Sequence, residues 1–388
     1  LAAREFSSHR AGLIAAGLTA SSPLLVWYSQ EARSYSLMVL LSAVALLAFA
    51  HLRERPTRGW TVAWSVAASL AMLTHYYAAL AILPQGAWLF VRHRPVRMVR
   101  YGVEAVIACC LLLVVLLVRQ LIFLGPGTNW INQIPLWHRV GEVPQTFALG
   151  PEAPLGGWLM VAFGILCLVA VGLLVKRADG VERGRASALA GLTLTGAAMV
   201  GGLIVIGFDQ LDSRNMMALW LPLVLVLAAG FGARRAGWIG VTGAAACCAI
   251  GVGCIVAVGL NPRLERPNWR GLAAALGHQP GRAIFALDTC NLLPLSVYLP
   301  SLRPMPAHGA TVRQVAVLVA RQSSDWYVRC PSSAAPPRVP SRLGGLQQVG
   351  PASLVDGFAV LRFQSPRPLK VTPRFLADTG LHGVSMVQ

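Results

Sequence analysis

The stretch GLIAAGLTASSPLLVWYSQEARSYSLMVLLSAVALLAFA, residues 12–50, holds a short polar segment between two long apolar runs. Glu31 and Arg33 lie two positions apart within that polar segment. Apolar runs of this kind are typical of membrane helices, and ionisable side chains at a membrane edge are costly to keep. The stretch therefore predicts a membrane helix on each side and a functional role for the polar residues between them.

The whole chain has the composition of a polytopic membrane protein. Of its 388 residues, 55% are hydrophobic and only 12% are charged, and the mean hydropathy is +0.60. Nine apolar runs predict membrane helices, at residues 12–27, 35–50, 60–73, 76–91, 101–123, 157–175, 187–207, 216–231 and 238–260. The third and fourth runs are short and almost adjacent, so they should form a tight hairpin with residues 74–77 at its tip. Because residue 1 is Leu and the first run has no leader before it, we expect the chain to be truncated at its N-terminus.

Basic residues are distributed unevenly among the connections between these runs. Alternate connections hold fifteen Arg or Lys residues, whereas the other short connections hold only Arg33, Arg139 and Arg214. The positive-inside rule places the first set in the cytoplasm, so Glu31, Arg33 and the hairpin tip should face outward. Much of the net charge of +18 is thereby explained by membrane topology, and no nucleic-acid partner is expected.

The composition changes after Leu260, and residues 261–388 contain no apolar run long enough to span a membrane. We expect a transmembrane domain at residues 1–260 and an exported soluble domain at residues 261–388. Within the second, the sequence predicts helices at 269–277 and 292–299, strands at 283–287, 315–320 and 358–363, and a loop at 331–340. The predicted fold class is therefore mainly α, with about nine transmembrane helices and a small exported α/β domain.

The eight cysteines divide between the two predicted domains. Six lie in apolar runs, where we interpret them as small packing residues. Cys290 and Cys330 lie in the predicted exported domain, where a disulfide between them is one possibility and two free thiols are the other. No CxxC motif or Cys/His cluster predicts a zinc site.

Polar side chains gather on the predicted outer face. They are Glu31, Arg33, His75, Tyr76, Tyr77, Arg119, Asn129, Trp130, Trp137, His138, Arg139, Glu142, Asp209, Asp212 and Arg214, with the residues from 129 to 142 in a long outer loop. Chemistry at the outer leaflet is one interpretation, and an aromatic belt with surface ion pairs is the other. A transporter is less favoured, because ionisable groups near mid-bilayer and repeated halves are not apparent.

Four segments of the sequence resemble a known family. Ser22-Pro23 with Trp27-Tyr28-Ser29-Gln30-Glu31-Ala32-Arg33-Ser34-Tyr35, and then Thr74-His75-Tyr76-Tyr77, resemble the bacterial polyprenyl-phosphate-sugar-dependent glycosyltransferases of GT-C fold that are related to protein O-mannosyltransferases. Asp212-Ser213-Arg214-Asn215 resembles their late outer-loop-to-helix junction. Arg266-Pro267-Asn268-Trp269-Arg270-Gly271 resembles the start of the exported domain in actinobacterial members.

The resemblance implies transfer of a sugar, mannose or another hexose or pentose, from a polyprenyl-phosphate carrier to an acceptor hydroxyl. The acceptor would be a glycan, a lipid or a protein at the outer face of the plasma membrane, and the reaction would invert the anomeric carbon. Such a transfer needs a carboxylate as general base, donors that stabilise the departing phosphate, and an apolar groove for the lipid tail. The alternative is a non-catalytic membrane protein that binds lipid-linked sugars or scaffolds assembly of the cell envelope.

The resemblance also implies which residues form the site. We expect substrate-binding roles for Glu31, Arg33, Tyr35, His75, Tyr76, Asp212 and Arg214. In this family the acidic residue that acts as general base lies in the first outer loop, between the first two membrane helices. This chain resembles the family from the third helix onward, so we expect the general base upstream of Leu1, with Glu31 shaping the site. The sequence identifies no cofactor, and a divalent cation is left open, with Glu31, His75, His138 and Asp209 as the candidate ligands.

Overall fold

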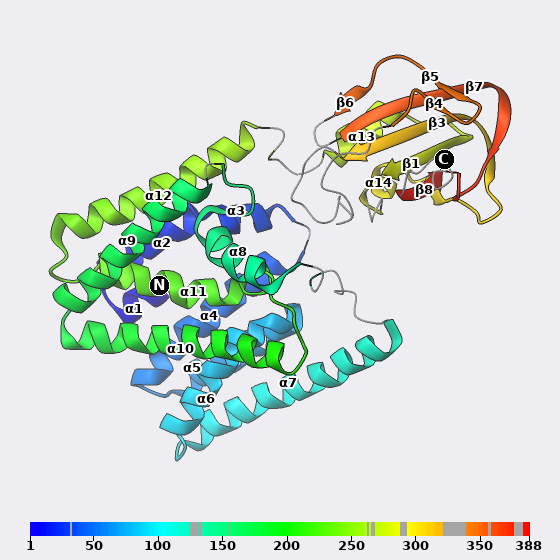
Figure 1. Cartoon of the computed structure of the whole chain (residues 1–388). Coiled ribbons are helices and arrows are strands. Elements are labelled where there is room, and N and C mark those ends of the chain that lie inside the picture. The colour runs from blue at the N-terminus through cyan, green and yellow to red at the C-terminus, as the bar shows by residue number, and fades with distance from the viewer. Residues whose placement is uncertain are drawn as a thin grey trace. The chain divides into compact units, whose positions relative to one another are not determined.

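The structure is a computed structural model that describes the chain except residues 32, 125–130, 132–133, 155, 262–263, 265–267, 288–292, 321–338, 356–357 and 376–382. It divides the chain into two compact units, Leu1–Val256 and Ala257–Gln388 (Figure 1). The first unit is helical and the second is built on a β-sheet. Each is described by itself below.

The helical part contains the following described elements: α1 (Ala2–Phe6), α2 (His9–Ala20), α3 (Pro23–Ser29), α4 (Tyr35–Glu54), α5 (Arg58–Thr74), the 3₁₀ turn η1 (Tyr76–Ala78), α6 (Ala79–Arg92), α7 (Arg97–Leu124), α8 (Leu136–Leu149), α9 (Gly156–Arg177), α10 (Gly180–Val205), α11 (Met217–Phe231) and α12 (Gly237–Gly259). Every predicted apolar run coincides with one of these helices or, for the first run, with the pair α2 and α3. The predicted hairpin corresponds to α5 and α6, with His75 and η1 at its tip.

Nine membrane spans are not confirmed. Among the described residues, α4, α7, α9, α10 and α12 are long and apolar enough to cross a membrane, and α2 with α3 would make a sixth span if the bent pair is counted as one. The remaining runs form helices of 17, 14 and 15 residues, namely α5, α6 and α11. At 1.5 Å per residue these helices are shorter than a bilayer core of about 30 Å, so length alone does not make them spans.

The long helices turn apolar side chains outward. Trp158 and Leu168 of α9 are 82% and 73% exposed, and Trp238 of α12 is 75% exposed. A water-soluble protein rarely presents so much contiguous apolar surface, whereas lipid tails solvate it without cost. The outer surface of the helical unit therefore points to a membrane protein.

A break separates α2 from α3, and their axes differ in direction by 54°. The Ser22 hydroxyl accepts a hydrogen bond from the Leu25 amide at 3.4 Å, and Pro23 occupies the first turn, where its missing N–H costs nothing. A new short helix therefore starts at the Ser-Pro pair. It ends at Ser29, which places Tyr28 and Glu31 at the junction with α4.

Helix α11 lies among the other helices of the unit and is buried along most of its length (Figure 1). Close contacts at small residues make this possible: a Cβ atom on Gly230 would lie 2.2 Å from the Ala170 carbonyl oxygen of α9. The connection that precedes α11, residues 206–216, is here named the α10–α11 loop. Because α11 is central, the end of this loop is buried too, at Ser213, Asn215 and Met216.

Helix α8 is a correction to the sequence prediction of a long outer loop. Trp137, His138, Arg139 and Glu142 all lie on this helix. Pro144 inside the helix and several polar residues hide the pattern. Its signal is the recurrence of Leu136, Val140, Val143 and Phe147 at helical spacing.

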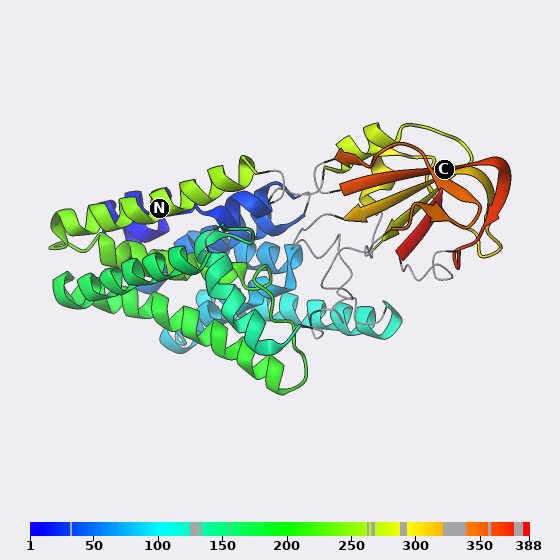
Figure 2. The same ribbon diagram turned by 45° about the horizontal axis from the view of Figure 1, so that its top comes forward.

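The second unit is an eight-stranded sheet in which β6 (Ser353–Val355) pairs only with β7 (Phe358–Val371), off the main strand order β2-β8-β1-β3-β7-β5-β4. Figure 2 shows these strands side by side. Strands β1 (Arg282–Leu287) and β3 (Ala310–Ala320) are parallel and the other pairs are antiparallel. The remaining strands are β2 (Arg303–Pro304), β4 (Arg342–Leu343), β5 (Leu346–Gln348) and β8 (Gly383–Val387).

Two helices pack on one face of this sheet. Leu272 and Leu276 of α13 (Trp269–Leu276), with Leu295 of α14 (Leu293–Tyr298), share a core with Ile284 and Leu318 of the central strands. The predicted helix at 269–277 and strands at 283–287, 315–320 and 358–363 coincide with α13, β1, β3 and β7, and the predicted helix at 292–299 corresponds to α14. Most of the predicted loop at 331–340 lies outside the described residues, as do Cys290 and Cys330.

Candidate functional site

A row of aromatic rings connects the two motifs that the sequence singles out. Tyr28 at the end of α3 packs edge-on against Tyr35 at the start of α4, with ring centroids 5.1 Å apart. Tyr35 packs against His75 at 5.2 Å, and His75 packs against Tyr77 at 5.6 Å. The structure thus brings the first motif and the α5–α6 hairpin tip together.

Glu31 and Arg33 lie beside this row, in the connection between α3 and α4 that is here named the α3–α4 link (residues 30–34). The Arg33 Nε atom is 3.8 Å from the Glu31 Oε2 atom, which is a long contact for an ion pair. The Glu31 side chain is 12% exposed and the Arg33 side chain is 38% exposed. The two side chains therefore form only a long ion pair.

Asp212 and Arg214 form a second polar pair in the α10–α11 loop. The Asp212 Oδ1 atom accepts the Arg214 backbone N–H at 3.0 Å and lies 3.3 Å from the Arg214 Nε atom. Both side chains are largely buried, at 19% and 11% exposure. Asn215 donates from Nδ2 to the Gln210 carbonyl oxygen at 2.9 Å, so the loop is fastened on both sides of Arg214.

The charges of this loop act on the aromatic row. Burial, followed by the nearby Arg214 charge, lowers the pKa of His75 to about 4. Burial raises the pKa of Tyr77, with the Asp212 carboxylate adding to the effect and Arg214 opposing it. Residues from three separate sequence segments therefore lie close enough to influence one another. The His75 ring accepts the Tyr77 backbone N–H at Nδ1, at 3.4 Å, and is neutral at neutral pH.

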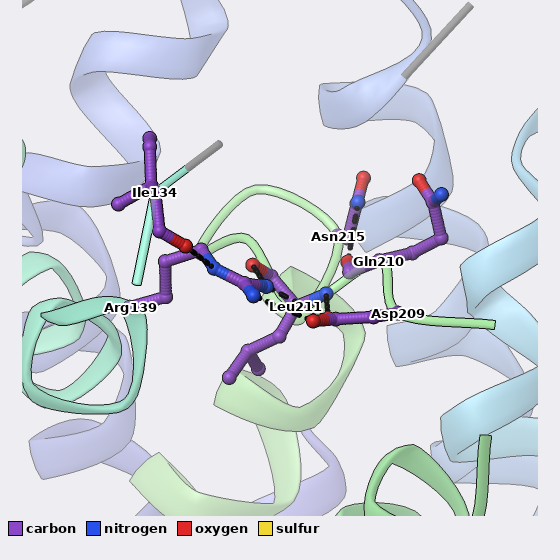
Figure 3. A network of polar contacts seen from close by, with 6 residues as sticks. All are labelled: Ile134, Arg139, Asp209, Gln210, Leu211 and Asn215. Atoms are coloured by element: carbon purple, nitrogen blue, oxygen red, sulfur yellow. Dashed lines mark hydrogen bonds and ion pairs between the residues drawn. The ribbon is translucent and has the colours of Figure 1, made fainter. Parts of the chain in front are cut away.

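A tighter ion pair joins Asp209, at the start of the same loop, to Arg139 of α8 (Figure 3). The Arg139 guanidinium, on the first turn of α8, bonds the Asp209 carboxylate through both of its oxygen atoms, at 2.7 Å and 2.5 Å. Arg139 also donates to the carbonyl oxygens of Ile134 at 2.9 Å and Leu211 at 3.2 Å. We name this pair the Arg139–Asp209 clamp. The hydrogen bonds from Arg139 hold the pKa of the Asp209 carboxyl below its usual range.

An apolar cavity of about 740 Å³ adjoins this polar region. Its lining includes Val140, Val143, Pro144 and Phe147 of α8, Phe163 and Gly164 of α9, Leu211 and Met216 of the α10–α11 loop, and Trp220 and Leu223 of α11. Because Leu211 and Met216 directly flank the segment Asp212–Asn215, the cavity and the Asp212–Arg214 pair share one loop. The arrangement suits a ligand with a long apolar part and a charged or polar part.

Not every predicted site residue joins this cluster. The Tyr76 hydroxyl lies 3.5 Å from the Gln120 Oε1 atom of α7, and the residue is 39% exposed, so Tyr76 lies apart from the row formed by its neighbours. Arg119 sits over the Phe123 ring at 5.8 Å from its centroid. Trp137 stacks on His138 with centroids 3.8 Å apart and is 71% exposed. Asn129 and Trp130 lie outside the described residues.

The candidate metal ligands are not gathered into one place. Within the part of the chain that the structure describes, no group of three His, Cys, Asp or Glu side chains is close enough to hold a metal ion. Asp209 is engaged by Arg139, and His138 stacks on Trp137. Cys109, Cys110, Cys167, Cys247, Cys248 and Cys254 are free thiols.

Sequence reasoning missed two features of the site. It left α8 as a loop, and so it did not pair Arg139 with Asp209, 70 positions away. It named Glu142 among the outer-face residues but gave it no site role; burial raises the pKa of the Glu142 carboxyl, and the Asp212 charge adds to this effect. The helical spacing of apolar residues in 136–147 could have indicated α8. Nothing in the sequence indicated the pairing of Arg139 with Asp209.

Comparison with known proteins agrees with the first part of this site. Residues 1–119 match the family model described as dolichyl-phosphate-mannose-protein mannosyltransferase. The matched range includes the α3–α4 link and His75 and stops before the α10–α11 loop. No curated protein matches the chain significantly, and no solved structure does. The match covers residues 1–119 of 388, so it shows a similarity to these mannosyltransferases in the first part of the helical unit.

Proposed function

We propose that this protein transfers a sugar from a polyprenyl-phosphate donor to an acceptor hydroxyl at the outer face of the plasma membrane. The observation that supports the proposal most is the apolar cavity of about 740 Å³, which shares the α10–α11 loop with Asp212 and Arg214. The apolar tail of such a donor can pack against this lining in place of bilayer lipid, through van der Waals contacts with the side chains. A guanidinium is well suited to a phosphate oxygen pair at the polar end of such a tail.

The proposed roles of the residues follow from their chemistry. Arg214 would bind the donor phosphate and stabilise its charge as the sugar leaves. Tyr28, Tyr35 and His75 would provide stacking surfaces and hydrogen bonds for the sugar, while Glu31, Arg33 and Asp212 would bind its hydroxyl groups. A single displacement by the acceptor hydroxyl would invert the anomeric carbon. The general base that takes the acceptor proton is not one of these residues, and we propose that it lies in an outer loop.

We also propose a topology for the chain. The uneven distribution of Arg and Lys supports an outward position for the α3–α4 link, the hairpin tip and the α10–α11 loop. The short helices α5, α6 and α11 would then lie at membrane depth, surrounded by the longer spans. The second unit, which follows α12, would be an exported domain available to contact the acceptor.

A transfer assay tests the proposed function. The purified full chain, reconstituted in liposomes, would be given polyprenyl monophosphates that carry labelled mannose or arabinose, together with envelope glycan, lipid and protein fractions as acceptors. We expect label to move to one acceptor fraction, and none to move when a sugar nucleotide replaces the lipid donor. Binding of the lipid donor without any transfer would favour the alternative, a non-catalytic protein that binds lipid-linked sugars.

Two glycines of α9 offer a matched test of the cavity. Neither Gly164 nor Gly172 has a neighbouring atom where a side chain would begin, but only Gly164 lines the cavity. Gly164→Leu should fill the cavity and weaken binding of undecaprenyl monophosphate, measured on the purified chain, by roughly tenfold. Gly172→Leu should leave binding unchanged. Equal binding by both variants would contradict a lipid tail in this cavity.

A further inference from the structure

The Arg139–Asp209 clamp is a buried ion pair with almost complete hydrogen bonding. The Arg139 side chain is 5% exposed, and its guanidinium donates to Asp209, Ile134 and Leu211. Removing two charges from water costs about as much as the pair returns, so apolar residues of similar volume would stabilise the fold as well. Stability alone therefore does not account for the clamp, whereas fixing one defined geometry does.

The clamp fixes the part of the α10–α11 loop that leads to Arg214. Asp209 accepts the Leu211 backbone N–H at 3.2 Å, and Arg139 donates to the Leu211 carbonyl oxygen at 3.2 Å. Both peptide groups of Leu211 are thus held, and Arg214 follows three residues later. Figure 3 shows the guanidinium facing the carboxylate, with Asn215 bonded to Gln210 in the same loop.

The clamp also joins two walls of the apolar cavity. Val140 and Val143 follow Arg139 on α8, and Leu211 follows Asp209 on the loop, and all three line the cavity. A second bond holds the other end of α8, where Trp220 Nε1 donates to the Phe147 carbonyl oxygen at 3.3 Å. The Arg139–Asp209 clamp therefore fixes the position of α8, which forms one wall of the cavity, relative to the loop that carries Arg214.

We propose that Arg139 and Asp209 are positioning residues, which hold Arg214 at the polar end of the apolar cavity so that one donor molecule meets both. The inference rests on the proposed function, because it makes the donor phosphate the group that Arg214 contacts. Arg139 itself is fully engaged within the protein and acts through the loop. The clamp thus makes α8 part of the donor site.

A double-mutant cycle on the full chain tests this role. Binding of undecaprenyl monophosphate would be measured for the wild type, Arg139→Ala, Arg214→Ala and the double variant. We expect Arg139→Ala to weaken binding at least tenfold, and the double variant to bind no worse than Arg214→Ala, because the clamp acts through Arg214. Effects that multiply, or full affinity in Arg139→Ala, would overturn the proposal. If Arg139→Ala does not fold, Arg139→Lys and Asp209→Asn replace it, since both keep most of the side-chain volume.

Arg185→Ala is the matched control. Arg185 also pairs with a residue far away in the sequence, Glu54, at 3.0 Å, but unlike Arg139 it is not adjacent to a residue that lines the cavity. Its loss should change binding less than twofold, and an equal loss in both variants would overturn a specific role for the clamp.

Hydrogen exchange separates this inference from the proposed function. In Arg139→Ala, we expect the amides of residues 208–216 to exchange at least tenfold faster, while peptides of α9 and α12 stay unchanged. If the wild type binds no undecaprenyl monophosphate, the proposed function fails and the exchange result alone decides whether the clamp orders the loop. Unchanged exchange in residues 208–216 would overturn the clamp itself.

Discussion

The α3–α4 link and the α10–α11 loop both carry an acid and an arginine two residues apart, yet the structure treats them differently. In the link, Glu31 and Arg33 are 3.8 Å apart and Arg33 is 38% exposed. In the loop, the Asp212 carboxylate accepts a hydrogen bond from the Arg214 backbone N–H. The Asp209 carboxylate, in the same loop, accepts hydrogen bonds from Arg139 of α8. The comparison teaches that spacing in the sequence does not decide how closely such a pair is held; the two regions differ in the burial of the arginine, 38% exposed in the link and 11% in the loop, and in the backbone hydrogen bond within the second pair.

The largest expected effect is on the loop. Asp209→Ala would leave the Arg139 guanidinium buried without its counter-charge, which should lower the free energy of unfolding by about 3 kcal/mol. Thermal unfolding of the chain in detergent measures the change. Arg139→Met with Asp209→Leu should recover much of that loss, because an apolar pair of similar volume needs no counter-charge. Equal stability of Asp209→Ala and the wild type would remove the contrast between the two regions.

Arg214→Ala should weaken binding of undecaprenyl monophosphate by roughly tenfold to a hundredfold, the value of one hydrogen bond to a charged group. Its effect on thermal unfolding should be smaller than that of Asp209→Ala, because Asp212 keeps its bond to the backbone N–H of residue 214. Arg235→Ala, an exposed arginine outside the site, serves as the control. Equal affinity of the two variants would mean that Arg214 is not the phosphate ligand.

His75 links the two regions and should make stability depend on pH. Its pKa is about 4 in the folded chain and about 6.5 when unfolded, so the unfolded state binds the proton first as the pH falls. Its contribution to stability is fully present above about pH 6.5 and is lost toward pH 4. His75→Gln should flatten this part of the curve of unfolding temperature against pH, whereas His308→Gln, at an exposed position in the second unit, should not. Identical curves for His75→Gln and the wild type would contradict the burial of this ring.

The smallest expected effect is on the stability of the α3–α4 link. Glu31→Gln should change the free energy of unfolding by less than about 1 kcal/mol, because a long and partly exposed ion pair contributes little. Transfer activity should fall more than stability does, if this pair faces the donor sugar. A large loss of stability would show that the link is held by contacts stronger than its ion pair.

Much of the helical unit was predictable because apolar periodicity is a local property. All nine runs are helical, and the break at His75 agrees with the predicted hairpin. The break at Ser22-Pro23 was not predicted, because residues 12–27 were expected to form one helix. Nine spans are not confirmed, because an apolar run forms either a long helix or a short buried one such as α11, and composition is similar in both cases. Helix α8 was missed because its apolar residues alternate with polar ones and a proline.

The sequence singled out candidate polar residues, but it did not show which of them lie close together. Composition, the distribution of Arg and Lys, and the motifs around Glu31 and His75 were enough to indicate a membrane protein with polar chemistry on one face. Only the tertiary structure joined Tyr35 to His75, set Tyr76 apart and paired Arg139 with Asp209. It also placed an apolar cavity against Leu211 and Met216, in the loop that carries Arg214. The physical reason is that hydropathy acts along the chain, whereas ion pairs and cavities depend on which helices meet, and the contacts of the whole helical unit determine that.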